Sequence, residues 1–147
     1  MAAPAAVLEY PATRYRVDAA PDLASRRERE RLSAPGLKTF FTIMARWQAR
    51  DEEARALLGG VTNGPFYEMK RNPARVLDTD RLTRLSFVIG IYKALHILHG
   101  DALADEWVRL PNRNPIFGGQ TPLAFMIRGG LPALQTVRRL LDARRAG

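Results

Sequence analysis

TDRLTRLSFVIGIYKALHILH, residues 79–99, contains the longest series of apolar residues at helical spacing in this chain. One set of these residues marks one face of a helix, and a second set, which includes Phe87 and Ile91, marks another face. A helix that is apolar on two faces must be covered on both. We therefore expect this helix to lie at the centre of its domain and to end at Gly100.

Shorter helices are expected on both sides of this central helix, and no segment alternates as a β-strand does. Ser33 is a suitable N-cap with Pro35 in the first turn, Asp101 is expected to cap a later helix, and Thr121 precedes a proline. Gly59-Gly60 and Gly129-Gly130 are typical helix stops. The expected helices are residues 33–47, 51–58, 62–71, 79–99, 101–110, 122–128 and 131–143. The sequence therefore predicts an all-α protein.

Composition limits the classes of protein to which the chain can belong. Its 147 residues carry a formal net charge of +8 and no cysteine, which excludes disulfides and thiolate metal sites. The N-terminus does not have the pattern of a signal peptide, and no apolar run approaches the length of a membrane span. We therefore expect a soluble, cytoplasmic protein with no membrane partner. The basic charge suits a polyanion such as nucleic acid, and equally an acidic protein surface.

Residues 51–71 have the spacing of a helix-turn-helix motif. In such a motif a small residue (Ala56) allows the helices to cross closely, Gly60 makes the turn, and later apolar residues hold the second helix. The residues then presented to a DNA major groove are Thr62, Asn63, Tyr67, Lys70 and Arg71. Gly64-Pro65 and Glu68 are unfavourable in a DNA-reading helix, so an ordinary helical turn is the alternative.

Chemistry by the chain itself is not expected. His96 and His99 are three residues apart, but two ligands are too few for a metal site. Asp101, Asp105 and Glu106 are explained by their place in the first turns of a helix, where the helix dipole favours negative charge. With no histidine, nucleophile or phosphate loop expected beside them, we predict no enzyme activity, no cofactor and no metal.

The stretch WVRLPNRNPIFGGQTPL, Trp107–Leu123, mixes turn-forming residues with large apolar ones. Flexible linkers are polar, so this composition predicts a fixed loop held by its own side chains. We expect Leu103, Trp107 and Leu110 to point inward and Phe117 to pack beside them. The turn residues would then set the angle at which the helices after Thr121 meet a partner.

From about Trp47 onward the chain resembles the Xre/MbcA/ParS family of type II antitoxins. The matching segments, in order, are Leu57–Thr62 (LLGGVT), Arg84–Leu95 (RLSFVIGIYKAL), Trp107 with Leu110–Asn112, Phe117–Leu123 (FGGQTPL), Met126, Gly129-Gly130, Leu134 and Val137–Ala143. The resemblance implies an antitoxin whose partner is a RES-domain toxin, an enzyme that consumes NAD⁺. It also implies a C-terminal region that blocks the toxin's active site, an Xre-like domain that binds operator DNA, and homodimers within a larger complex.

With this resemblance we expect three parts. Residues 1–32 form a flexible, basic and at most weakly helical arm, either solvated or touching phosphates; residues 33–78 form the Xre-like helix-turn-helix domain; residues 79–147 form the helical toxin-binding domain. Helix 131–143 would dock on the toxin by its apolar face, and its basic end would reach the pocket for the NAD⁺ phosphates. The expected toxin-binding residues are Asn112, Arg113, Gln120, Arg138, Arg139, Arg144 and Arg145. The alternative is an autonomous DNA-binding regulator without a cognate toxin.

Overall fold

The computed structural model describes residues 21–146, which form helices and turns with no β-strand among them. The α-helices are α1 (Arg26–Arg46), α2 (Asp51–Leu57), α3 (Asn63–Arg71), α4 (Thr79–Leu98), α5 (Asp101–Glu106) and α6 (Pro122–Ala146); two 3₁₀ turns are η1 (Trp107–Arg109) and η2 (Pro115–Phe117). The all-α prediction is confirmed. Most of the expected arm, residues 1–20, lies outside the described residues, as does residue 147.

The start of α1 differs from the prediction. The N-cap is Ser25, whose hydroxyl accepts a hydrogen bond from the Glu28 amide, so α1 begins well before Ser33. Residues 26–32 are therefore helical and not part of a flexible arm. Ser33 is fully buried inside the helix, where its hydroxyl donates to the Arg29 carbonyl and accepts from the Leu77 amide at 2.9 Å. Its role is a tertiary contact across 44 residues, which local sequence cannot reveal.

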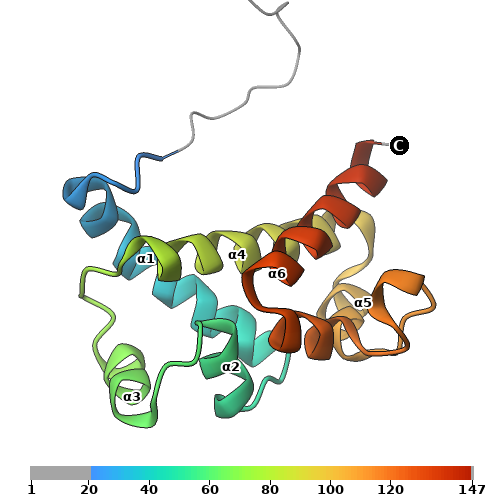
Figure 1. Cartoon of the computed structure of the whole chain (residues 1–147), viewed down its shortest axis with the longest axis horizontal. Coiled ribbons are helices and arrows are strands. Elements are labelled where there is room, and N and C mark those ends of the chain that lie inside the picture. The colour runs from blue at the N-terminus through green and yellow to red at the C-terminus, as the bar shows by residue number, and fades with distance from the viewer. Residues whose placement is uncertain (1–20, 147) are drawn as a thin grey trace, which may run out of the picture.

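The central position predicted for α4 is confirmed. Both α1 and α6 pack against it, and Figure 1 shows α4 running through the middle of the molecule, where the other two helices cross it. Val88, Ile91 and Leu95 of α4 are fully buried. These residues belong to one continuous apolar cluster that extends from Leu37 to Leu141. Because this cluster includes both parts of the chain, the boundary at residues 78 and 79 stays a prediction.

The glycine stops lie where they were expected. Gly59 and Gly60 have φ values of +94° and +87° at the end of α2, a conformation that side chains with a Cβ rarely adopt. Gly130 has φ +65° and ψ −147°, which breaks α6 into the two helices predicted from residues 122 and 131. Pro65 stands in the first turn of α3, where a missing N–H costs no intrahelical bond.

The segment around α5 departs from the expected single helix. Its N-cap is Gly100 rather than Asp101, and the α-helix ends at Glu106, where the chain tightens into η1. Leu103 and Leu110 are 45% and 42% exposed, so the prediction that both point inward was wrong. The change from α to 3₁₀ geometry alters the angle between successive side chains and rotates Leu110 out of the expected face.

No helix among residues 21–146 is long and apolar enough to cross a membrane.

Candidate functional site

The residues predicted to read DNA lie on the outside of α3 and its N-cap. Thr62, Asn63, Tyr67, Lys70 and Arg71 are all exposed. Two of them face an acidic residue at the start of α2: the Tyr67 hydroxyl donates to Asp51 at 3.2 Å, and Lys70 Nζ lies 3.1 Å from the same carboxylate. The hydrogen bond from Lys70 holds the pKa of the Asp51 carboxyl below its usual range.

Charge around α3 is balanced within the α2–α3 segment itself. Arg71 pairs with Glu68 one turn earlier, and Lys70 also lies over the Phe66 ring, 5.5 Å from its centroid. Residues 51–71 carry one more acidic than basic side chain: Asp51, Glu52, Glu53 and Glu68 against Arg55, Lys70 and Arg71. The net charge of +8 therefore comes from outside this segment, mainly from α1 and α6.

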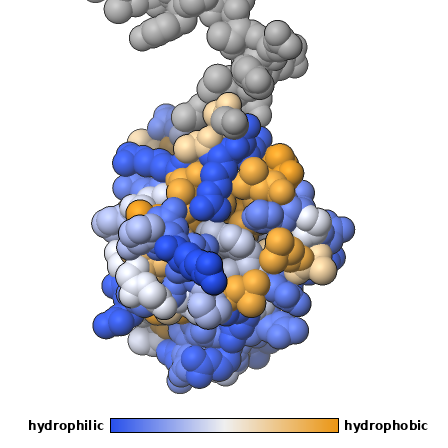
Figure 2. All heavy atoms as spheres, turned by 90° about the vertical axis from the view of Figure 1, so that its right-hand side faces the viewer, coloured by the Kyte–Doolittle hydropathy of each residue, from blue (hydrophilic) through white to orange (hydrophobic). Residues whose placement is uncertain are grey.

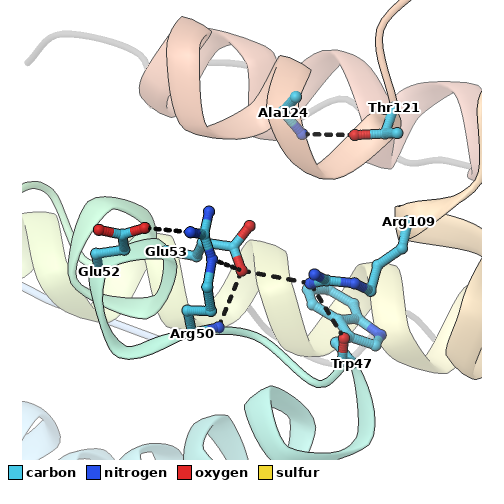
Figure 3. Close-up of polar contacts among 7 residues, drawn as sticks. All are labelled: Trp47, Arg50, Glu52, Glu53, Arg109, Thr121 and Ala124. Atoms are coloured by element: carbon cyan, nitrogen blue, oxygen red, sulfur yellow. Dashed lines mark hydrogen bonds and ion pairs between the residues drawn. The ribbon is translucent and has the colours of Figure 1, made fainter.

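A cluster around Glu53 joins α2 to the turn that follows α5 (Figure 3). Its carboxylate accepts a hydrogen bond from the Arg50 backbone amide at 2.9 Å and lies 3.3 Å from Arg109 Nη1. Arg109 also reaches the Trp47 carbonyl at 3.5 Å. Burial raises the pKa of the Glu53 carboxyl, but these hydrogen bonds outweigh it and hold the pKa below its usual range. The cluster fixes the start of the 107–123 loop against the end of α1.

The 107–123 loop is held by its own side chains, as predicted. The Phe117 ring is fully buried and meets Trp107 edge to face, with centroids 6.0 Å apart. The Asn112 side chain accepts a hydrogen bond from the Asn114 amide at 2.9 Å. Thr121 accepts from the Ala124 amide at 3.1 Å and so caps α6 as expected (Figure 3).

The three loop residues expected to touch a toxin have different surroundings. Arg113 is exposed, whereas Asn112 and Gln120 are half-buried. Asn112 already uses its side-chain oxygen inside the loop. The buried Gln120 Oε1 has no hydrogen-bond partner among the described residues. Of these three residues, Arg113 is therefore the one whose side chain is most accessible to a partner.

The second half of α6 presents charge outward and apolar residues inward. Leu134, Val137 and Leu141 are fully buried in the core of this chain. The expectation that this helix docks on a partner by its apolar face was therefore wrong, because α4 already covers that face. Arg139 and Arg144 are exposed, and the Arg145 guanidinium lies 3.8 Å from the Asp142 carboxylate.

Arg138 is positioned differently from the other three arginines in the second half of α6. Its Nε donates to Asp142 at 2.9 Å, and its guanidinium lies against Gly90 of α4. A Cβ added at Gly90 would stand 1.4 Å from Arg138 Nη1. Arg138 is therefore packed across α4, while Arg139, Arg144 and Arg145 extend from the outer side of the helix.

The structure brings a histidine to the acidic residues of α5, an approach that was not expected from the sequence. His96 Nδ1 lies 3.0 Å from Asp101 and His96 Nε2 lies 3.0 Å from Asp105. Tyr92 packs against the His96 ring with centroids 4.3 Å apart. Both ring nitrogens are engaged, so the arrangement ties α5 to the end of α4 and leaves neither nitrogen for another ligand.

The exposure of four apolar side chains was not expected from the sequence. They are Ile97 of α4, Leu103 of α5, and Leu110 and Ile116 of the 107–123 loop. Figure 2, which faces the side that carries α5 and the end of α6, shows hydrophobic groups among hydrophilic ones. Helical spacing marked Leu103 and Leu110 as apolar positions of the helix, but it placed both on the buried side.

Comparison with known proteins identifies the C-terminal part. Residues 93–147 match the family model described as "Antitoxin Xre/MbcA/ParS C-terminal toxin-binding domain". The chain is 36% identical over 112 residues to "Uncharacterized protein y4oB" of Sinorhizobium fredii, a match that covers 76% of this chain and 84% of that protein. No solved structure matches the chain. The matched domain contains the 107–123 loop, both halves of α6 and the arginines described above.

Proposed function

Because the chain belongs to the Xre/MbcA/ParS antitoxin family, we propose that it neutralises a RES-domain toxin, an enzyme that consumes NAD⁺. In this proposal residues 93–147 cover the toxin's active site. The chain acts by binding and not by catalysis, so the purified protein alone consumes no NAD⁺. The class of partner, a toxin protein, follows from the family; the RES type is the part that is proposed.

The observation that carries the proposal is the exposed basic end of α6. Arg139 and Arg144 extend from the outer face of the helix without an ion pair among residues 21–146, and Arg145 has a weak one. A toxin pocket for NAD⁺ must offer polar groups to phosphates and riboses. Guanidinium groups only donate hydrogen bonds, and they donate strongly to oxygen acceptors, so they compete for the acceptors in such a pocket that bind the ribose hydroxyls. Arg113 and Gln120 of the loop, with Asn112, extend the contact surface.

The test measures NAD⁺ consumption by the RES-type toxin encoded beside this protein, with increasing amounts of the antitoxin. Arg144→Glu/Arg145→Glu should weaken inhibition about tenfold or more, because arginine is one of the residue types that most often contribute large binding energies at interfaces. The matched control is Arg26→Glu/Arg27→Glu, two adjacent exposed arginines at the far end of α1, which should inhibit as the original does. Full inhibition by the α6 variant would remove these arginines from the mechanism.

We also propose that α3 binds operator DNA and represses the operon, with the antitoxin acting as a homodimer. The supporting observation is the exposure of Asn63 in the first turn of α3 and of Lys70 about two turns later on the same face. Asp51 holds Lys70 in the free protein, so DNA must compete with this carboxylate. The alternative, a DNA-binding regulator without a toxin, shares this surface and lacks the toxin contact.

A mobility shift with the upstream promoter tests the DNA-binding proposal. Asn63→Ala and Lys70→Ala should each weaken binding, and Lys70→Ala should also reduce the salt dependence of affinity by about one phosphate contact. Asp51→Asn releases Lys70 and should strengthen binding. Unchanged affinity in all three variants would place the DNA contact elsewhere. A separate measurement, light scattering of the free protein, tests the homodimer.

A further inference from the structure

A groove of about 550 Å³ lies between α1 and α4, with one residue of α6 at its end. α4 provides most of the floor, and α1 provides one wall over its second to fourth turns. Its lining includes Gly36 and Thr39 of α1, Leu82, Ile89 and Lys93 of α4, and Arg138 of α6. In Figure 1 this region lies where α1 and α6 cross α4.

The lining combines an apolar floor with small residues. Leu82 and Leu85 are almost fully buried at the bottom, and Ile89 is half-buried above them. Gly36 of α1 and Ser86 of α4 leave the groove open at positions where larger side chains would fill it. The lining positions on α4 recur at helical spacing from Leu82 to Lys93, which is about 16 Å of helix. This length accommodates about three turns of a docked helix, the usual geometry of helix-in-groove recognition.

One end of the groove is basic. Lys93 is exposed, and no carboxylate forms an ion pair with it within residues 21–146. The Arg138 guanidinium lies over Gly90 beside it, with Asp142 as its partner. An occupant with apolar side chains along one face and a carboxylate at one end would match both the floor and this end.

The position of Lys93 and Arg138 connects the groove to the toxin-binding domain. Both residues belong to the matched range 93–147, whereas the α1 wall lies outside it. Lys93 and Arg138 thus place one end of the groove within the matched toxin-binding domain, and the α4 floor from Leu82 to Gly90 continues the groove beyond it. We propose that the toxin inserts an amphipathic segment with acidic residues into the α1–α4 groove, so that its interface extends beyond the matched domain onto α1. The inference rests on the proposed function.

A protein segment suits this groove better than a nucleic acid does. Nucleic acid binding depends on a series of cations that follow the phosphates. In this groove the cations are confined to one end. The rest of the lining is uncharged and includes Leu32 and Gly36 of α1 and Ile89 of α4. Burial of apolar surface, with one charged contact to fix direction, is the pattern of a protein–protein contact.

The first experiment measures the affinity of the full-length antitoxin for the adjacent RES-type toxin. Lys93→Glu reverses the charge at the basic end and should weaken binding about tenfold. Lys38→Glu is the matched control: it also reverses an exposed helical lysine, on α1 and outside the groove lining, and should bind as the original does. Equal affinities for the two variants would overturn the groove proposal.

The second experiment uses the absence of cysteine from the chain. Thr39→Cys places one thiol in the groove wall, and Lys38→Cys places one beside it outside the lining. Toxin should slow alkylation of the first about fivefold or more and leave the second within about twofold, because a buried thiol is shielded from reagent. Protection of Thr39→Cys by promoter DNA instead of toxin would overturn the proposal in favour of nucleic acid. Binding of toxin with no protection would overturn it and keep the proposed function; no toxin binding by the original protein would overturn both.

Discussion

Ser33→Ala should destabilise the fold by about 1–2 kcal/mol, although serine to alanine is favourable in an isolated helix. The Ser33 hydroxyl is the acceptor for the Leu77 amide, and both residues are buried. Removal of the hydroxyl leaves a buried N–H without a partner, which costs about 1–3 kcal/mol. Alanine returns about 0.5 kcal/mol through its higher helix propensity. The free energy of unfolding therefore falls on balance, because the unpaired buried N–H costs more than the higher helix propensity of alanine returns.

Urea unfolding followed by circular dichroism measures this loss. The midpoint should fall with an unchanged slope, and the melting temperature should drop by about 2–4 °C for each kcal/mol in a chain of this size. Ser86→Ala is the control, since Ser86 is exposed in α4 and should change stability by less than about 0.5 kcal/mol. A Ser33→Ala loss below about 0.5 kcal/mol would show that the Leu77 amide does not depend on this hydroxyl.

Three further outcomes are expected. Gly130→Ala should destabilise by about 1–3 kcal/mol in the same unfolding assay, because its φ of +65° with ψ −147° strains any residue with a Cβ; a neutral result would contradict the kink. Gly90→Ala should displace the Arg138 guanidinium yet leave stability within about 1 kcal/mol, because the flexible side chain moves and alanine favours the helix; a larger loss would mean that this contact holds α6 in place. Stability should fall as pH drops below about 4.5, because Asp51 and Glu53 have lowered pKa values in the folded state and their contribution is complete only above the unfolded values. Glu53→Gln should reduce this acid dependence, and an identical pH profile would exclude Glu53 as a source.

Much of the fold was predictable because its signals are local. The central helix, the glycine stops at Gly60 and Gly130, and the Thr121 cap follow from periodicity and from conformations that only some residues adopt. The fixed character of the 107–123 loop was also predictable from its mixture of turn and apolar residues. The start of α1 was not, since Ser33 and Pro35 satisfy the local rule for a helix start while a distant amide determines the role of Ser33.

The candidate sites were less predictable because they depend on which side chains meet. The sequence shows that Lys70 and Asp51 have opposite charges, and only the approach of α3 to α2 pairs them. His96 and its two aspartates are a similar case, assembled by the turn between α4 and α5. The exposure of Leu110 follows from the change to 3₁₀ geometry at Trp107, which helical spacing does not reveal.

The sequence by itself determined the helical class, most helix boundaries and the membership of the antitoxin family, because these depend on local preference and on residues in order along the chain. Tertiary structure alone decided which face of α6 is free. The apolar residues of that helix suggested a docking face, but packing on α4 buries them and leaves the arginines outside. A stripe of apolar residues shows that burial will occur, and only the folded arrangement shows whether the partner is another helix of the same chain.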